Sequence, residues 1–349
     1  GQLLAKSGNT YKVLMLDEST KFMTLSVLKK IKTLVDAGVK VVGAKPEKSP
    51  SMADNDAEFK NLAAEIWKSK HITSIEKLNI QPDLKISGTI NEVLFRHRNI
   101  SLSTAQLEQA TNNQSTDIYW LNNRSDSPTT AEVSFRVTGK IPELWNAQTG
   151  KTEKLSYQIK DGRTIVPLKF ESWDAYFVVF KEKAAAQSYD KPKTTETLLT
   201  TINKPWQVSF GNQSAIFERL TSWHENSDAG LKYFSGTATY ENTFKAPQPP
   251  MGAVWLDLGN VKNVAEIYVN GQNMGTVWKK PFKVDISSAL KEGENNLKIN
   301  VTNTYVNRLI GDAQPNAIKT TFTTMPFYKS NSPLVPAGLL GEVKVIGVK

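Results

Sequence analysis

The hydrophobic periodicity of the chain changes once, near residue 72, and this change limits the folds open to it. Residues 11–16 and 39–42 are short apolar runs typical of buried strands. A helical spacing of apolar residues follows each run, over 24–37 and 54–68. The order strand–helix–strand–helix predicts a parallel α/β unit with a right-handed crossover. Two strands are too few for a complete doubly wound domain, so we expect this first unit to be partial.

Beyond this point the sequence is typical of β-structure. Short alternating runs between turn residues predict a small β-sandwich over residues 73–182. Asp161-Gly162 and Asn270-Gly271 are dipeptides that favour two-residue hairpins. Residues 202–349 carry many further short strands, in the number and spacing of a jelly roll. The predicted fold class is therefore mostly β, with an α/β unit at residues 1–72.

A polar stretch separates the two β-rich regions. Residues 183–201 are rich in Lys, Ala, Gln, Ser and Thr and show no periodicity, which is typical of a linker. The Pro-Gln-Pro-Pro run at 247–250 predicts a loop inside the second β-rich region.

Composition excludes several classes of protein. The 349 residues include no Cys, which excludes a disulfide framework, an iron–sulfur cluster and a thiol nucleophile. The formal net charge is +9, but the Lys residues are dispersed rather than clustered, so we expect no nucleic-acid partner. No apolar run approaches the roughly 18 residues of a membrane span. The chain begins with Gly and shows no signal-peptide pattern, so we interpret it as a processed or expressed fragment.

Motifs that carry chemistry are scarce. The sequence has no P-loop, no G-x-S-x-G, no H-E-x-x-H and no EF-hand loop. Arg96-His97-Arg98 is the densest polar triplet, and two guanidiniums beside an imidazole suit an anionic or polyhydroxyl partner. The alternative is a solvated or salt-bridged strand end.

Two tryptophans are further candidates for contact with a carbohydrate. Trp223 stands beside His224 and Glu225, and Trp278 is followed by Lys279. An aromatic ring with neighbouring donors can stack on a sugar and bond its hydroxyls. For both tryptophans the alternative is a ring packed in the core. A glycosidase would also need two carboxylates across a glycosidic bond, and sequence alone does not pair them.

Three groups of sequence stretches resemble glycoside hydrolase family 106, the α-L-rhamnosidase family typical of gut Bacteroidetes. Residues 11–51 resemble the amidotransferase-like, flavodoxin-like α/β domain that follows the family's catalytic barrel. The runs VLFRHR, DIYWLNNR and PELWNAQTGK resemble its β-domain, and lie at residues 93–98, 117–124 and 142–151. The remaining stretches resemble the galactose-binding-like jelly roll of family 2 glycosidases, and lie at residues 230–244, 256–287, 301–312 and 336–347. The polar loop at 99–116 is longer than the resemblance leads us to expect.

This resemblance implies a function for the region. The family's catalytic carboxylates lie in a (β/α)8 barrel, and no eight-fold βα pattern occurs here, so no catalytic residue is transferred to this chain. The resemblance implies a non-catalytic accessory region, inactive alone, whose partners are the upstream barrel of the same polypeptide and an oligosaccharide. It also implies a periplasmic or extracellular bacterial protein and allows a structural Ca²⁺ on the jelly roll, although no compact acidic loop is evident. The alternatives are a free-standing carbohydrate-binding protein and a purely structural assembly module.

Overall fold

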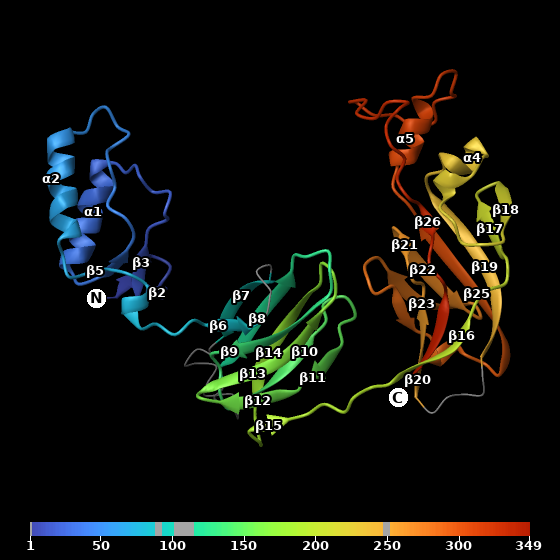
Figure 1. Ribbon diagram of the computed structural model, residues 1–349, viewed down its shortest axis with the longest axis horizontal. Coiled ribbons are helices and arrows are strands. Elements are labelled where there is room, and N and C mark those ends of the chain that lie inside the picture. The colour runs from blue at the N-terminus through green and yellow to red at the C-terminus, as the bar shows by residue number, and fades with distance from the viewer. Residues whose placement is uncertain (1, 88–92, 101–114, 247–251) are drawn as a thin grey trace. The chain divides into compact units, whose positions relative to one another are not determined.

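The computed structural model describes residues 2–87, 93–100, 115–246 and 252–349 (Figure 1). The loop predicted at 247–250 and most of the polar loop at 99–116 lie outside these residues. The chain divides into two compact units, Gly1–Lys85 and Ile86–Lys349, which are described separately.

The first unit contains the predicted parallel α/β structure. Three strands pair in parallel in the order β3–β4–β5, so the sheet has one short strand more than the sequence indicated. Its helices and strands are β1 (Leu3–Leu4), β2 (Thr10–Tyr11), β3 (Val13–Met15), α1 (Leu25–Asp36), β4 (Lys40–Val42), α2 (Asp56–Trp67), β5 (Ile72–Thr73) and η1 (Glu76–Leu78). Leu28, Val41 and Phe59 are fully buried where the helices meet the sheet. The amphipathic spacing of both helices supplies this core.

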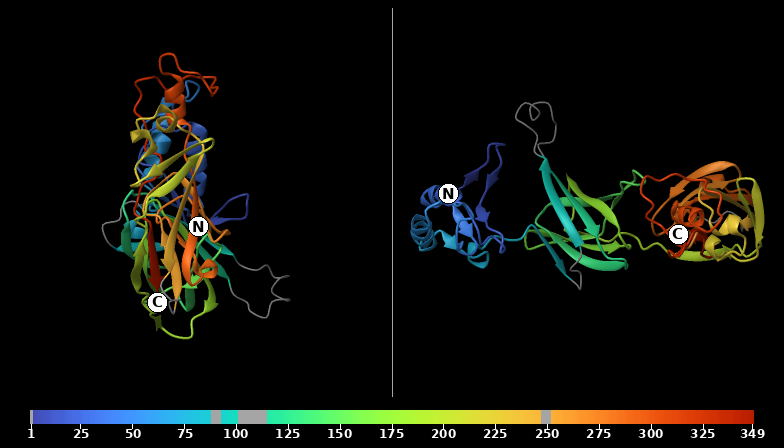
Figure 2. Two further views of the ribbon diagram at one scale, coloured as in Figure 1. Left: turned by 90° about the vertical axis from the view of Figure 1, so that its right-hand side faces the viewer. Right: turned by 90° about the horizontal axis from the view of Figure 1, so that it is seen from above.

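The first part of the second unit consists of two antiparallel sheets, and its strands form two layers in Figure 2. One sheet has the order β11 (Thr152–Lys154), β10 (Lys140–Trp145), β14 (Ala175–Lys183), β8 (Thr116–Asn123) and β7 (Val93–Ile100). The other has the order β15 (Ser188–Tyr189), β12 (Tyr157–Lys160), β13 (Arg163–Phe170), β9 (Thr129–Phe135) and β6 (Leu84–Ser87). The rings of Tyr119 and Phe135, one from each sheet, lie 4.8 Å apart at 72°. Alternating apolar residues therefore face each other across a sandwich core.

The second part of this unit is also built from antiparallel sheets. A four-stranded sheet has the order β16 (Glu196–Thr201), β27 (Lys344–Val348), β20 (Ala253–Asp257) and β24 (Lys283–Asp285). A six-stranded sheet has the order β18 (Gln213–Phe217), β17 (Trp206–Phe210), β19 (Thr237–Ala246), β25 (Gly293–Thr302), β22 (Val264–Val269) and β23 (Gln272–Val277). The remaining elements are β21 (Val261–Lys262), β26 (Gly338–Leu339), α4 (Ala229–Lys232), α5 (Val306–Asp312), η2 (Trp223–Glu225) and η3 (Ser287–Ala289). Apolar residues of both sheets form one core, among them Val208, Leu256 and Ile299.

Both predicted two-residue turns have the backbone that their sequence favours. Asp161 and Gly162 have φ of 51° and 73°, and the flanking residues Lys160 and Arg163 pair across β12 and β13. Asn270 and Gly271 have φ of 50° and 84° between β22 and β23. Positive φ at both central residues is the requirement of a type I′ turn.

The structure differs from two predicted boundaries. The compact units divide after Lys85 rather than at residue 72, because η1 and the chain leading to β6 group with the first unit. Much of the predicted linker at 183–201 is strand, since β15 pairs with β12 and β16 pairs with β27. Leu199 of β16 packs against the core. A single inward-facing apolar residue gives too little alternation for the sequence to predict a strand.

Candidate functional site

The side chains of Arg96, His97 and Arg98 do not converge. All three lie on β7, the edge strand of its sheet, where successive side chains point to opposite faces. Arg96 and Arg98 are exposed, whereas His97 is half-buried on the other face and stacks on Tyr119, with ring centroids 4.0 Å apart. The triplet is therefore not a single cationic site.

His97 belongs to a polar cluster centred on Asp117. The Asp117 carboxylate accepts hydrogen bonds from Lys140 Nζ and Asn99 Nδ2, both at 2.7 Å, and lies 3.2 Å from His97 Nε2. Burial raises the pKa of this carboxyl, but the bonds from Lys140 and Asn99 outweigh burial and hold the pKa below its ordinary value. A buried carboxylate with these partners is a structural ion pair that fixes β7 to β8 and β10.

Trp223 lies in the core of the second β-rich region. Its side chain is completely buried, and its indole N–H donates to the hydroxyl of Tyr240 at 2.5 Å. Gly338 closes over the ring, because a Cβ at that position would overlap the indole. No face of the Trp223 ring is open to a sugar in this structure. The ring is packed in the core, which was the alternative interpretation of the sequence.

Trp278 and Lys279 differ from each other in surroundings. Trp278 follows β23 and is 58% exposed. The ammonium of Lys279 forms an ion pair with Asp174 at 2.5 Å, and its side chain is 26% exposed. Trp278 therefore presents an open ring, whereas Lys279 already has a partner within the chain.

A metal site is not apparent from side chains. Among the residues that the structure describes, no group of three or more His, Cys, Asp or Glu is placed to hold a metal ion. The Ca²⁺ that the resemblance allows therefore has no side-chain site of this kind in the described part of the chain. In the same part of the chain, no helix is long and apolar enough to cross a membrane.

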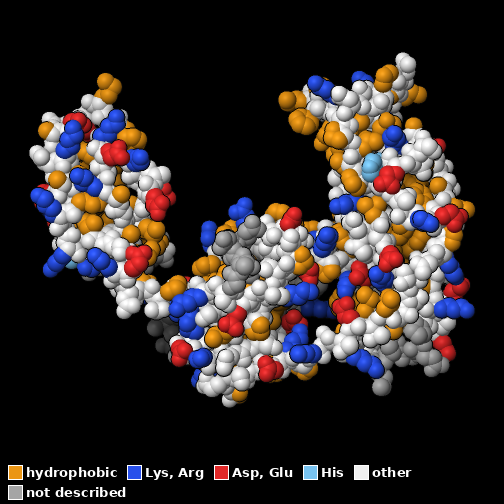
Figure 3. Space-filling model, in the orientation of Figure 1, with side chains coloured by type: hydrophobic (Ala, Val, Ile, Leu, Met, Phe, Trp, Pro, Cys, Tyr) orange, Lys and Arg blue, Asp and Glu red, His pale blue; other side chains and the backbone are white. Residues whose placement is uncertain are grey.

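The most distinctive surface follows helix α5, in a segment that sequence reasoning had not singled out. We call residues 313–335 the apical segment. Ile318, Phe322, Met325 and Phe327 are between 79% and 88% exposed in it. Figure 3 shows hydrophobic side chains gathered at this end of the domain. Four large apolar side chains this exposed within ten residues are unusual for a protein surface.

Polar side chains of α5 hold the apical segment in place. Asp312 accepts hydrogen bonds from Thr321 Oγ1 at 2.6 Å and from Thr321 N at 2.9 Å, and it forms an ion pair with Arg308 at 2.8 Å. Buried Asn307 donates to Val335 O at 2.8 Å and accepts from Val335 N at 2.9 Å. These ties act at the middle and at the end of the segment.

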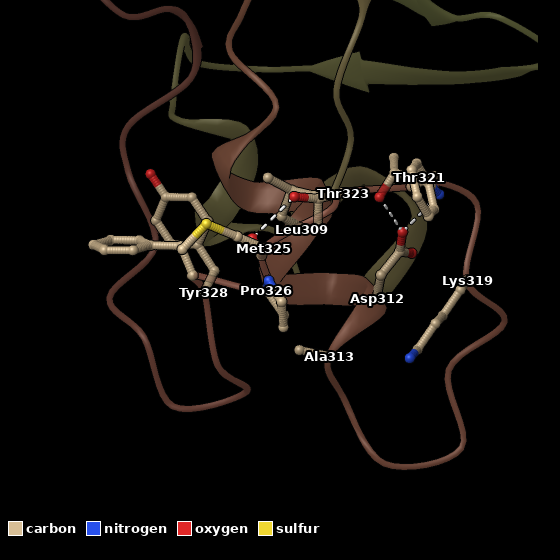
Figure 4. Close-up of a pocket in the computed structure, with 11 residues that line it drawn as sticks. Leu309, Asp312, Ala313, Lys319, Thr321, Thr323, Met325, Pro326 and Tyr328 are labelled. Atoms are coloured by element: carbon tan, nitrogen blue, oxygen red, sulfur yellow. Dashed lines mark hydrogen bonds between the residues drawn. The ribbon is translucent and has the colours of Figure 1, made fainter.

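Between the helix and the segment lies a cavity of about 410 Å³. Its wall includes Leu309, Pro326 and Tyr328, with Asp312 and Lys319 at one side (Figure 4). Burial raises the pKa of the Asp312 carboxyl, but its bonds with Thr321 and Thr320 and the charge of Arg308 together lower it below the ordinary value. The Asp312 carboxylate is thus ionised and bonded to residues that hold the apical segment. The rest of the cavity wall is mainly apolar.

Aromatic and apolar residues without strand or helix periodicity were the available signal for the apical segment. Phe322, Met325, Phe327 and Tyr328 are interleaved with Thr, Lys and Pro. Such a run predicts only a loop, because the partners that tie it down lie in α5 and are recognised only in three dimensions.

Comparison with known proteins places these regions. Residues 1–159 match the glycoside hydrolase family 106 described as alpha-L-rhamnosidase. Residues 221–330 match the family described as glycosyl hydrolase 2 galactose-binding domain-like. A curated protein of Formosa agariphila, named "Putative beta-glucuronidase", is 23% identical, with 99% of this chain aligned to 51% of the relative. The chain thus spans about half the length of that relative.

A solved structure covers the whole chain. The rhamnosidase of Novosphingobium sp. PP1Y is 35% identical and superimposes with a TM-score of 0.81, over 100% of this chain and 34% of that protein. An uncultured Clostridium β-glucuronidase aligns with 46% of this chain at 18% identity and a TM-score of 0.33. The predicted resemblance is therefore confirmed: the chain carries a family 106 α-L-rhamnosidase region together with a galactose-binding-like domain of the family 2 type.

Proposed function

We propose that this chain is a non-catalytic accessory region of a rhamnosidase-like glycoside hydrolase, and that its apical segment packs against the catalytic part of the longer polypeptide. One observation carries the proposal. Phe322, Met325 and Phe327 are almost fully exposed, yet the segment bearing them is tied down by buried Asp312 and Asn307. A surface that is apolar and ordered has the properties of an interface.

The amount of aligned chain supports the same proposal. This chain corresponds to 34% of the Novosphingobium rhamnosidase, which leaves two-thirds of that protein to supply a catalytic domain. None of the polar clusters described above pairs two free carboxylates across an open cleft, as glycoside hydrolysis requires. Activity on rhamnosides and a periplasmic or extracellular location belong to this proposal for the longer protein.

An activity assay tests the non-catalytic role. The isolated chain is expected to release no nitrophenol from 4-nitrophenyl α-L-rhamnopyranoside, with the Novosphingobium rhamnosidase as the positive control. Measurable turnover that survives repurification would contradict the proposal.

The solved rhamnosidase tests the docking role. Its residues aligned with Phe322 and Phe327 should be buried against the part of that protein that has no counterpart here. The residue aligned with Ile216, which is 72% exposed on β18, is the control and should stay exposed. Solvent-exposed counterparts of both phenylalanines would remove the docking part of the proposal.

A free-standing carbohydrate-binding protein is the second candidate. The exposed side chains of Arg96, Arg98 and Trp278 remain proposed glycan contacts, while Lys279 is paired and the ring of Trp223 is buried.

A further inference from the structure

The outer face of the six-stranded sheet carries a row of polar side chains from four adjacent strands. Gln207, Glu241, Lys298 and Tyr268 come from β17, β19, β25 and β22 and are directly opposite one another in register. We call these four residues the open row. They line a groove of about 650 Å³, together with Asn296 and other neighbours. At about 4.8 Å between strands the row is about 14 Å long, which suits an extended ligand.

Two of the four residues of the open row, Gln207 and Glu241, have polar groups that no other described residue bonds. Gln207 and Glu241 are exposed, and among the described residues neither the Gln207 amide nor the Glu241 carboxylate has a hydrogen-bond partner. Lys298 faces Glu241 across the strands, where opposite charges ordinarily pair, but its ammonium lies over the Tyr268 ring instead, 5.2 Å from the centroid. The Gln207 amide, which donates and accepts, and the Glu241 carboxylate, which accepts, are therefore left for a ligand to bond.

The neighbouring row is arranged in the opposite way. Thr239 Oγ1 donates to Asn300 Oδ1 at 3.0 Å, and Asn300 Nδ2 donates to Glu266 Oε2 at 3.2 Å. Asn273 Nδ2 donates to the second Glu266 oxygen at 3.0 Å. This paired row is satisfied within the chain. The Tyr268 hydroxyl is bonded within this paired row as well. The contrast between the two rows therefore lies in Gln207 and Glu241.

The chemistry of the open row selects the class of ligand. A carboxylate accepts, an ammonium donates and a primary amide does both, which matches hydroxyl groups that donate and accept. Tyr268 adds an aromatic ring, while its hydroxyl is already bonded to Glu266 and Asn273. One negative and one positive charge cancel, so the row does not favour a charged ligand. We propose that the open row binds an uncharged oligosaccharide along the groove, independently of the docking proposed for the apical segment.

Affinity electrophoresis tests the proposal on the whole chain. Native gels contain galactomannan, xyloglucan or arabinan as uncharged polymers, and polygalacturonate as the anionic one. At least one uncharged polymer should slow the chain. Glu241→Ala and Tyr268→Ala should each weaken that binding at least about tenfold, since a bond to a charged group or a stacked ring is lost.

Matched controls separate the row from sheet surface in general. Gln158 and Glu132 are exposed on β12 and β9, and their Ala variants should bind as the parent does. Unchanged thermal unfolding of Glu241→Ala and Tyr268→Ala shows that both variants are folded.

Two outcomes overturn the proposal. One is that no uncharged polymer slows the chain, and the other is that a Glu241→Ala/Tyr268→Ala double variant is slowed as much as the parent. If only polygalacturonate slows the chain, the ligand is anionic, and the assignment to uncharged oligosaccharides is overturned. A Phe322→Asp variant should still bind, so failure of the docking proposal remains distinguishable.

Discussion

At the scale of single residues, Asp117 links local chemistry to the stability of the sandwich. Its carboxylate is nearly buried and holds Lys140 and Asn99. Because the pKa of the folded state lies below the unfolded value of about 3.9, the carboxylate stabilises the fold above about pH 4. That contribution is lost as the pH falls through the folded pKa.

Asp117→Asn should lower the free energy of unfolding by about 2 kcal/mol at neutral pH, since it leaves Lys140 without its charge partner. The difference from the parent should narrow below about pH 4. Urea unfolding of the variant and the parent at several pH values measures this difference in the free energy of unfolding. Asp190→Asn, at an exposed carboxylate, is the control and should match the parent throughout. A difference that stays constant down to pH 3 would speak against the ion pair.

The residue scale also shows where sequence reasoning ends. Arg96-His97-Arg98 is compact in sequence, but strand alternation sends His97 to one face and both arginines to the other. Trp223 stands in a polar tripeptide yet lies in the core. Its burial depends on Gly338, which lies far away in the sequence and leaves room for the ring, and on the hydroxyl of Tyr240, which accepts from the indole N–H.

Gly338 provides a test of that packing. It has φ of 106°, and a Cβ there would meet the indole of Trp223. Gly338→Ala should destabilise the domain by more than about 3 kcal/mol and change the tryptophan emission, because backbone strain adds to overpacking. Gly139 also has positive φ, 71°, but open space around it, so Gly139→Ala should cost only about 1–2 kcal/mol. Equal losses in the two variants would contradict the role of the indole.

At the scale of elements, the structures that depend on neighbouring residues were predicted correctly, whereas those that depend on pairing between distant segments were not. The helical spacing and the Asp161-Gly162 and Asn270-Gly271 turns were correct, because each depends on neighbouring residues. β16 was predicted as linker, because its strand character comes from pairing with β27, more than 140 residues later. The open row was not predicted either, since it exists only when four strands are placed in register.

The apical segment gives a prediction at this scale. Asp312→Asn weakens the bonds to Thr321 and the ion pair with Arg308. The variant should keep its core but become more sensitive to limited proteolysis within 313–335, with about 2 kcal/mol lost at neutral pH. Asp190→Asn is again the matched control. Unchanged cleavage within the segment would show that these ties do not order it.

At the scale of the whole molecule, two compact units with separate cores predict separate unfolding. Leu28 is fully buried in the first unit and Leu297 is almost fully buried in the second. Urea unfolding followed by fluorescence and circular dichroism should show two transitions. Leu28→Ala should shift only one of them and Leu297→Ala only the other, each by about 2–5 kcal/mol. One transition shifted by both variants would show that the units unfold together.

The ties that hold the apical segment also affect the rate and strength of association. A loop that orders only on contact loses conformational entropy at that moment and binds more weakly for the same area. Here Asn307 and Asp312 fix the segment during folding of its own domain, before any partner is present. Association through this surface should therefore approach rigid-body kinetics, with a dissociation rate set by the fit of Phe322 and Phe327 rather than by the unfolding of the loop.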